Sequence, residues 1–499
     1  MRGSRTSKLL SYGTLIILSG ALVWGQTLPS SGMQPQQIIN IPGWRATGSA
    51  GNANTDLFGF NPVTRMMYLA DRTNHAVTVI DTHANVVVSR ITLPVGTTVN
   101  VPIVAVELQQ LAVSDGLQSV YVFDLRAPQP QPDIYTFPTS RGGVTDAIDY
   151  DPINETMYVV TDTPPEYLIG INLAYKQVVA EIPLPASSDL IKFNPVDGKI
   201  YIAAEDADGS NASAAAGLYV YDPATGPNGQ VTLLTKIGPA CPGHGIDIDP
   251  ISNVAVMGCF GPPLGKGDVA ISLKDGTLLK TFNVGGTDTI VFNPNIRRFY
   301  AGAGLNAVAL NNCPSPPKSP FFGTLVPVVG VFDATGANGA ATEYAPACSG
   351  AGNHIAGVDP ITNTVYVPVG QYPPDPNSTT TGQNGVLVFK DTTPPAQAPV
   401  TSAQAVLTPV GSSAAAGTVQ FTLVGRRMHV SGTPTGITGN AAWLVVPTTV
   451  TTEFLACAVN KAGSNAVCGE DMLGDPLIGS VATLSVDGVA AARGPIATH

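Results

Sequence analysis

The stretch Phe58-Gly-Phe-Asn-Pro-Val-Thr-Arg-Met-Met-Tyr68 decides the fold, because its pattern returns along most of the chain. Apolar residues alternate up to an Asn-Pro or Asp-Pro pair, where proline presets φ for a turn, and a second alternating stretch follows. Each copy therefore predicts a β-hairpin. Further copies begin at Ile148, Ile191, Ile246, Ile290 and Ala356, and residues 104–113 form a degenerate copy with a shortened turn.

Two more strands are predicted after each hairpin. A third alternating segment, such as Val77-Thr-Val-Ile-Asp81, comes next, and most units end with a fourth, such as residues 87–94. Four strands repeated seven times are typical of a β-propeller. The seventh unit has no fourth strand of its own, and residues 37–42 match the missing one, so this N-terminal strand is expected to close the ring. The sequence predicts an all-β fold with a seven-bladed β-propeller over residues 36–391.

This repeat resembles the YVTN-repeat β-propellers, a family of exported or cell-surface seven-bladed propellers within the broader WD40/YVTN repeat-like group. The resemblance rests on the Asn/Asp-Pro turn, the following Tyr and the later Val-x-Val-Ile-Asp segment, and residues 58–93 match it best. The family has no single activity. The resemblance therefore implies a scaffold and an exported location, and it implies no particular reaction.

A second, smaller domain is predicted after the propeller. Residues 392–403 are rich in Pro, Ala and Thr and are expected to form a linker. Beyond them, residues 404–499 contain four alternating segments, at 418–424, 442–446, 453–459 and 480–486, which predict a small β-sandwich-like domain.

The N-terminus has the features of a secretory signal peptide. Arg2, Arg5 and Lys8 precede an apolar run over residues 9–23, and small residues follow. The run is shorter than the roughly 20 apolar residues of a membrane-spanning helix. We expect cleavage after residue 25, no transmembrane anchor in the mature chain, and a periplasmic, cell-surface or extracellular location.

The cysteine content fits an exported protein. Six cysteines, an even number, favour disulfides in an oxidising compartment over catalytic thiols. We expect Cys241 to pair with Cys259, Cys313 with Cys348, and Cys457 with Cys468. The alternative is that Cys241 or Cys348 binds a metal beside a neighbouring histidine.

Composition excludes several classes of protein. The 499 residues include 53 Gly and 43 Pro, which rules out a mainly helical fold. A hydrophobic content of 44% with only 12% charged residues rules out disorder. The formal net charge of −11, with no basic cluster beyond the leader, makes nucleic acid an unexpected partner.

One column of the repeat carries polar residues that could form a site. Five positions before the turn Asn or Asp, six of the seven units have an acid or an imidazole, whereas the second unit has Val104. The innermost strand of each blade starts at this position, so these side chains should ring one mouth of the axial channel. They are Asp56, Asp146, Asp189, His244, Asp288 and His354.

Two interpretations of this column remain open. Each carboxylate could cap backbone N–H groups and tie adjacent blades together. Alternatively, some of the groups could bind a cation or polar ligand, since oxygen ligands suit Ca²⁺ or Mg²⁺ and the imidazoles of His244 and His354 suit a transition metal.

Loop lengths and missing motifs shape the functional hypotheses. Long loops at 203–217, 259–267, 303–327 and 370–384 should lie on the face of this column. No nucleophile elbow, His-Glu-x-x-His motif or phosphate-binding loop occurs. The leading hypothesis is an exported, non-catalytic binding or cell-surface propeller whose partner is a protein, glycan or small molecule. The alternative is a metal-dependent propeller enzyme of lactonase or oxidoreductase type.

Overall fold

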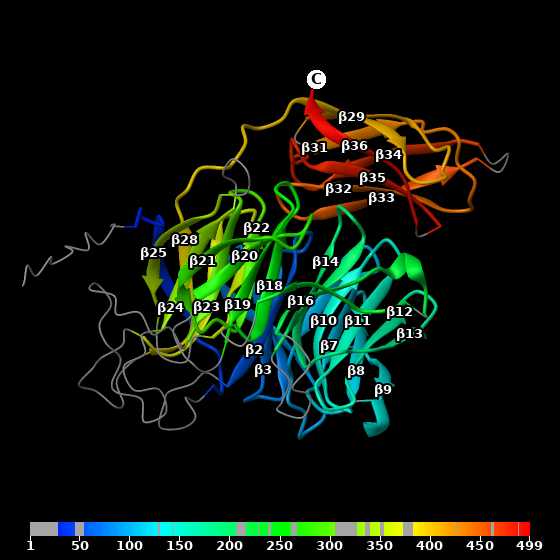
Figure 1. The fold of residues 1–499 in the computed structure, drawn as a ribbon. Coiled ribbons are helices and arrows are strands. Elements are labelled where there is room, and N and C mark those ends of the chain that lie inside the picture. The colour runs from blue at the N-terminus through cyan, green and yellow to red at the C-terminus, as the bar shows by residue number, and fades with distance from the viewer. Residues whose placement is uncertain are drawn as a thin grey trace, which may run out of the picture.

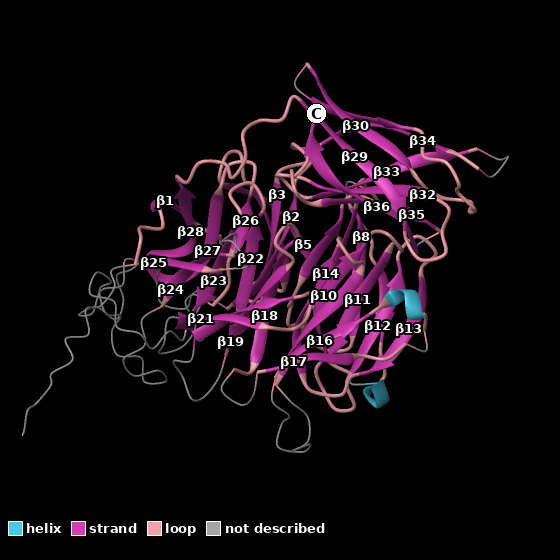
Figure 2. Cartoon of the chain, turned by 45° about the horizontal axis from the view of Figure 1, so that its top comes forward, coloured by secondary structure: helices cyan, strands magenta, loops and turns pink. Residues whose placement is uncertain are grey.

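The computed structural model describes residues 28–44, 54–127, 130–141, 143–205, 216–227, 229–237, 241–260, 267–304, 327–334, 340–349, 354–372, 383–425, 427–460, 464–487 and 489–499. The predicted signal peptide lies outside these residues. Within them, the only helical elements are two short 3₁₀ turns, η1 (Thr139–Arg141) and η2 (Pro223–Thr225), and all other regular structure is strand (Figure 2). No helix in the described part has the length and apolarity needed to cross a membrane.

Seven four-stranded antiparallel sheets form the propeller, as the repeat predicts. Blade 1 comprises β2 (Thr55–Asn61), β3 (Met66–Asp71), β4 (Ala76–Asp81) and β5 (Val86–Thr92). Blade 2 comprises β6 (Pro102–Ala105), β7 (Gln110–Ser114), β8 (Ser119–Asp124) and β9 (Asp133–Thr136). Blade 3 comprises β10 (Thr145–Asp151), β11 (Thr156–Thr161), β12 (Tyr167–Asn172) and β13 (Gln177–Pro183). Blade 4 comprises β14 (Ser188–Asn194), β15 (Lys199–Ala204), β16 (Gly217–Tyr221) and β17 (Thr232–Lys236).

The last three blades follow the same order. Blade 5 comprises β18 (Gly243–Asp249), β19 (Val254–Cys259), β20 (Gly267–Ser272) and β21 (Leu278–Gly285). Blade 6 comprises β22 (Thr289–Asn293), β23 (Arg298–Ala303), β24 (Val328–Asp333) and β25 (Thr342–Cys348). Blade 7 comprises β26 (Gly357–Asp359), β27 (Thr364–Tyr372), β28 (Gln383–Asp391) and the N-terminal strand β1 (Met33–Ile39).

The N-terminal strand closes the ring, as predicted. Strand β1 pairs antiparallel with β28, with Met33 opposite Asp391 and Ile39 opposite Val386. The strand begins at Met33, four residues before the segment recognised in the sequence. This pairing covers the outer edge of the last blade, which would otherwise expose unpaired N–H and C=O groups.

The Asn/Asp-Pro turns owe their shape to side chains that are almost completely buried. The turn residue accepts a hydrogen bond from the backbone N–H two positions later, for example Val63 to Asn61 at 3.0 Å and Ile361 to Asp359 at 2.9 Å. The turn then ends on a residue with positive φ, which lets a tight loop return into the second strand. These residues are Arg65, Gln109, Glu155, Gly198, Asn253, Arg297 and Asn363.

Two of the motif tyrosines anchor neighbouring blades to one another. Tyr300 and Tyr366 are fully buried, yet each phenol finds a polar partner in a neighbouring blade. The Tyr300 hydroxyl donates to Asp391 at 2.8 Å, and the Tyr366 hydroxyl donates to Asn85 at 2.7 Å. A large apolar ring with a satisfied hydroxyl fills the space between sheets without leaving a buried polar group unpaired.

The C-terminal domain is an eight-stranded sheet that closes on itself, in the order β29-β30-β31-β34-β33-β32-β35-β36. Its strands are β29 (Ser402–Pro409), β30 (Gly417–Val424), β31 (Arg427–Gly432), β32 (Ala442–Pro447), β33 (Thr452–Val459), β34 (Ala466–Met472), β35 (Val481–Val486) and β36 (Val489–Thr498). Figure 1 shows this domain, in orange and red, lying over one face of the propeller. Val445 and Phe454 pack into the apolar core that blades 3 to 5 share, so the two domains are joined by apolar contact.

Two of the three predicted disulfides are confirmed. Cys241 is bonded to Cys259 at the two ends of the inner hairpin of blade 5. Cys457 is bonded to Cys468, and these residues lie opposite each other on β33 and β34. Cys313 lies outside the described residues.

Removing the Asp359 carboxylate should destabilise the junction between blades 7 and 1. Asp359 accepts hydrogen bonds from Arg65 at 2.6 Å and from the Thr82 hydroxyl at 2.8 Å, and its side chain is fully buried. We expect Asp359→Ala to lower the free energy of unfolding by about 3 to 5 kcal/mol, because the guanidinium loses its partner in a partly buried place. Denaturant unfolding followed by tryptophan fluorescence measures this change.

Asp81→Ala is the matched control. Asp81 makes the same kind of turn contacts, accepting from His83 N at 2.8 Å and Ala84 N at 3.2 Å, but among the described residues no arginine pairs with it. Its loss should cost only about 1 kcal/mol. Equal losses in the two variants would contradict a special role for the junction between blades.

Candidate functional site

The six predicted column residues lie at or just before the beginning of the innermost strands, around one mouth of the channel. In blades 1, 3, 4 and 5 the column residue is the second residue of the strand, and the pairing register shifts at that point. Such a bulge takes a side chain out of the ladder and re-aims it, and bulges of this kind are frequent beside binding sites. The four bulged positions are Asp56, Asp146, Asp189 and His244.

The second blade supplies a seventh polar residue that the sequence analysis did not identify. Ala105 pairs with Gln110 just as Asn61 pairs with Met66, so the turn has full length and the prediction of a shortened turn is wrong. The column position is therefore Asn100, five residues before Ala105. Val104 is instead a buried core residue. The misalignment arose because alanine replaces the turn Asn or Asp and no proline follows it.

A chain of side-chain contacts joins the first three blades. Arg72, directly after β3, forms an ion pair with Asp56 and donates a hydrogen bond to Asn100 Oδ1 at 2.6 Å. Asn100 Nδ2 in turn donates to Asp146 Oδ1 at 3.0 Å. The ring residues of blades 1 to 3 are thus linked through an arginine and an amide, and both groups come from outside the predicted set.

The ring continues through His244 of blade 5, which links blade 4 to blade 6. His244 Nδ1 lies 2.8 Å from Asp189 Oδ2 and 3.4 Å from Asp288 Oδ1, and Nε2 contacts Glu205 Oε1. Phe260 packs against the imidazole at a centroid distance of 4.5 Å. One histidine therefore gathers three carboxylates around it.

His354 lies farther along the ring. Its Nε2 is 3.9 Å from Asp288 Oδ2 and 3.2 Å from the Thr55 carbonyl oxygen of blade 1. The group of side chains close enough to share one ion consists of Asp189, His244 and Asp288. In the described part of the chain, His354 is not a member of that group.

Asp146 of blade 3 and Asp189 of blade 4 each contact another ring residue, but among the described residues no side chain bridges the two carboxylates. Burial raises the pKa of Asp146 well above its ordinary value, and the charges of Asp189 and Asp56 raise it further. Burial also raises the pKa of Asp189, despite the nearby imidazole of His244. Ionising both carboxyl groups is therefore costly on this side of the mouth.

Burial and neighbouring charges also set the pKa values of Asp56, His244 and Asp288. Burial raises the pKa of Asp56 to about 8, although Arg72 opposes the shift. Burial alone would lower the pKa of His244, but Asp189, Asp288 and Glu205 raise it far above the usual value. Burial would raise the pKa of Asp288, yet its contacts with His244 and the charge of His354 hold it below the usual value.

Two polar atoms in the ring have no hydrogen-bond partner. They are His244 Nδ1 and Asp189 Oδ2, which are buried and lie close together, but not in the alignment of a hydrogen bond. Buried polar atoms in folded proteins are nearly always hydrogen-bonded, so this misaligned pair distinguishes the ring as the candidate site.

The capping role considered for this column belongs to other residues. Across the described ranges, no ring carboxylate accepts a hydrogen bond from a backbone N–H. Deeper in the channel, Asp149 accepts from Phe193 N at 2.6 Å and Asp247 accepts from Phe292 N at 2.8 Å, each from the next blade. These two aspartates join blades through the backbone, whereas the ring residues meet side chain to side chain.

A second column surrounds the first and was missed in the sequence. Eleven positions after each turn residue, at the end of the second strand, lie Arg72, Asp162, Glu205 and Phe260 in blades 1, 3, 4 and 5. Arg72, Glu205 and Phe260 contact ring residues directly. The same alignment that gave the first column would have found this one, because antiparallel pairing places the end of the second strand beside the start of the first.

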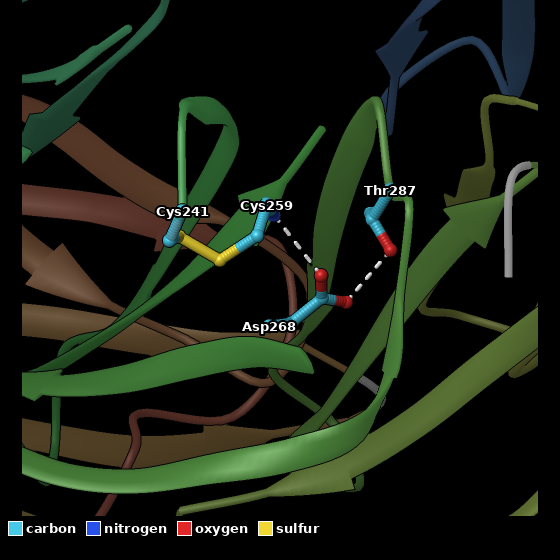
Figure 3. The surroundings of a disulfide bond; sticks show 4 residues. All are labelled: Cys241, Cys259, Asp268 and Thr287. Carbon is cyan, nitrogen blue, oxygen red and sulfur yellow. Dashed lines mark hydrogen bonds between the residues drawn. A yellow bond between two sulfur atoms is a disulfide. The ribbon is translucent and has the colours of Figure 1, made fainter. Parts of the chain in front are cut away.

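The Cys241–Cys259 disulfide and a buried aspartate hold the blade 5 side of the site (Figure 3). Asp268 accepts a hydrogen bond from Cys259 N at 3.1 Å and from the Thr287 hydroxyl at 2.7 Å. Cys259 precedes Phe260, and Thr287 precedes Asp288. Asp268 therefore positions the two segments that lead into the ring next to His244.

A second concave region lies on the opposite face. A hollow of about 1460 Å³ separates the Asn/Asp-Pro turns from the C-terminal domain, and it is lined by residues that include Lys192, Asp247 and Phe454. Lys192 Nζ lies 3.3 Å from Asp247 Oδ1, and Asp247 also binds backbone N–H groups. Because these charged groups already pair with one another, we place the candidate site at the ring.

The long loops expected on the ring face, at 203–217, 259–267, 303–327 and 370–384, fall largely outside the described residues.

Comparison with known proteins shows the fold and nothing more. No family model and no curated protein matches the chain. Among solved structures, a chain of the mitotic checkpoint complex matches with a TM-score of 0.51 and 9% identity, covering 77% of this chain and 99% of that one. A chain of hydrazine synthase from Kuenenia stuttgartiensis gives 0.50 and 12%, covering 71% and 99%, and U3-55K gives 0.50 and 10%, covering 73% and 99%. At these identities the likeness shows a shared propeller fold.

The free energy of unfolding should depend on pH because the buried Asp268 carboxyl group keeps its proton in the folded state. Burial raises the pKa of Asp268 to about 8, against the effect of its two hydrogen bonds. Because the folded state holds this proton more tightly than the unfolded state, stability falls as pH rises from about 4 to 8. Asp268→Asn should make the slope of unfolding free energy against pH less negative by about 1.4 kcal/mol per pH unit in this window.

Asp275→Asn serves as the control for this series. Asp275 is exposed, and hydrogen bonds from Ser272 and Thr277 hold its pKa below the usual value, so it titrates outside the window. Its removal should leave the slope unchanged. A wild-type slope retained in Asp268→Asn, measured by denaturant unfolding at several pH values, would show that Asp268 is ionised throughout.

Proposed function

We propose that this protein is an exported, non-catalytic binding propeller of the YVTN-repeat type, and that it recognises a positively charged ligand at the ring mouth. The observation that carries the proposal is the unbalanced ring itself. The charge of Asp189 adds to the burial that raises the pKa of Asp146, and Asp189 Oδ2, 2.8 Å from His244 Nδ1, makes no aligned hydrogen bond. A bound cation would relieve both the repulsion and the unsatisfied atom.

Three sequence features support the exported location. The first 25 residues have the pattern of a signal peptide, the even cysteine count suits an oxidising compartment, and the repeat resembles exported propellers. Two disulfides are formed in the described residues, in agreement with such a compartment. The long loops of the ring face would enlarge the contact surface for a protein, glycan or small-molecule partner.

Thermal unfolding in the presence of three cations tests this function. We expect that at least one of Ca²⁺, Zn²⁺ and spermidine, at about 1 mM, raises the Tm of the mature protein by about 2 °C or more. The double variant Asp146→Asn/Asp189→Asn should lose this response, because it removes the two buried carboxylates between blades 3 and 4.

The double variant Asp124→Asn/Asp133→Asn is matched in charge and should respond like the wild type. Its two aspartates are 43% and 46% exposed and pair only with surface cations. A wild-type Tm that no cation raises, or an equal response in both double variants, would refute recognition at the ring. Turnover of a small molecule that depends on His244 would refute the non-catalytic part and favour the metal-dependent enzyme.

A further inference from the structure

The geometry points to a transition-metal site at the ring, formed by Asp189, His244 and Asp288, with Zn²⁺ or a similar divalent ion as its ligand. This inference rests on the proposed function, since it names the cation that the mouth binds. The three side chains come from three successive blades and offer one nitrogen and two oxygens that lie within 4.8 Å of one another.

The distances suit ligands of a single ion. In a tetrahedral site with bonds of about 2.0 to 2.2 Å, ligand atoms stand about 3.4 Å apart. His244 Nδ1 lies 3.4 Å from Asp288 Oδ1 and 2.8 Å from Asp189 Oδ2. Small side-chain rotations would equalise these two separations. The set of one imidazole and two carboxylates leaves a fourth position for water or for a further ligand from the channel.

Glu205 would fix the imidazole in the form that a metal needs. His244 Nε2 contacts Glu205 Oε1, so the ring proton of a neutral imidazole belongs on Nε2 and the lone pair of Nδ1 faces the two aspartates. Metal-binding histidines usually have such a carboxylate behind them. Phe260 packs on the imidazole and limits its rotation. Glu205 and Phe260 are thus positioning residues, and they do not bind the ion.

Ligand type favours a transition metal over Ca²⁺ or Mg²⁺. The hard alkaline-earth ions select oxygen ligands, and Ca²⁺ takes six to eight of them, whereas imidazole nitrogen suits Zn²⁺, Cu²⁺ and Ni²⁺. The nitrogen available at this site is the buried Nδ1 that lacks a hydrogen-bond partner. His354, predicted from the sequence as a second metal ligand, contacts the other oxygen of Asp288 and would help to orient it.

Titration of the chelator-treated mature protein with ZnCl₂ tests the site by calorimetry and elemental analysis. We expect one Zn²⁺ per chain, affinity reduced at least about 100-fold in His244→Ala, and affinity reduced about 10- to 100-fold with unchanged stoichiometry in Glu205→Gln. His429→Ala is the matched control. His429 also contacts a carboxylate, Asp471 at 3.2 Å, but lies exposed on the C-terminal domain. It should bind Zn²⁺ like the wild type.

Circular dichroism spectra of each variant establish that it is folded, and Co²⁺ provides a second readout through visible absorption bands that His244→Ala should abolish. Zn²⁺ binding that survives His244→Ala would overturn the site. A wild-type protein that binds no metal, yet is stabilised by spermidine through Asp146 and Asp189, would overturn the metal inference and leave the proposed function standing. A protein that responds to neither would refute both.

Discussion

The structure depends on one constraint, which is that every blade must present its first strand to the axis and its last strand to the outside. The ring is closed at the outer edge of blade 7, where β1 supplies the fourth strand and pairs along β28. The inner strands cannot be covered in this way. Seven of them converge on one narrow channel, so residues at equivalent positions become neighbours even though they are more than 40 positions apart in sequence.

Because the inner strands converge, aspartates repeated at one position are brought close enough to repel each other. A single aspartate at the start of a strand is harmless, but several of them around one axis repel each other and lose hydration. The protein solves part of this problem with Arg72, Asn100 and His244, which bridge the ring carboxylates. Between Asp146 and Asp189 no residue in the described ranges does so. A cost of this kind persists in folded proteins chiefly where function needs it.

Much of the fold could be predicted because the same turn and strand pattern occurs in nearly every unit of the repeat. The Asn/Asp-Pro turn and the alternation of apolar residues each act within a few residues, so the sequence of each unit is enough to predict its blade. The C-terminal domain has no repeat, and four of its eight strands were not predicted. β36, Val-Ala-Ala-Ala-Arg-Gly-Pro-Ile-Ala-Thr, is rich in Ala and contains Gly-Pro, and only its pairing with β29 and β35 makes it a strand.

The repeat also predicted part of the site, but it could not predict contacts that depend on packing between blades. The column identified which residues meet at the mouth, because position in a repeat determines position around an axis. The side chains that link the column residues, such as Asn100 and Glu205, were harder to predict from the sequence. Asn100 was hidden by a unit that lacks the turn Asn or Asp, and Glu205 belongs to a different strand, whose nearness to His244 depends on how neighbouring blades pack.

The two mouths of the channel differ in a way that separates stability from binding. On the turn face, Asp149 and Asp247 bind backbone N–H groups of the next blade, Lys192 lies beside Asp247, and the C-terminal domain lies over them. On this face, groups of the protein itself pair with the charged side chains. On the ring face, His244 Nδ1 and Asp189 Oδ2 lie 2.8 Å apart but make no aligned hydrogen bond within the described chain. Aspartates on the inner strands are thus fully paired at one mouth, where they join the blades, and incompletely paired at the other, where we propose that a ligand binds.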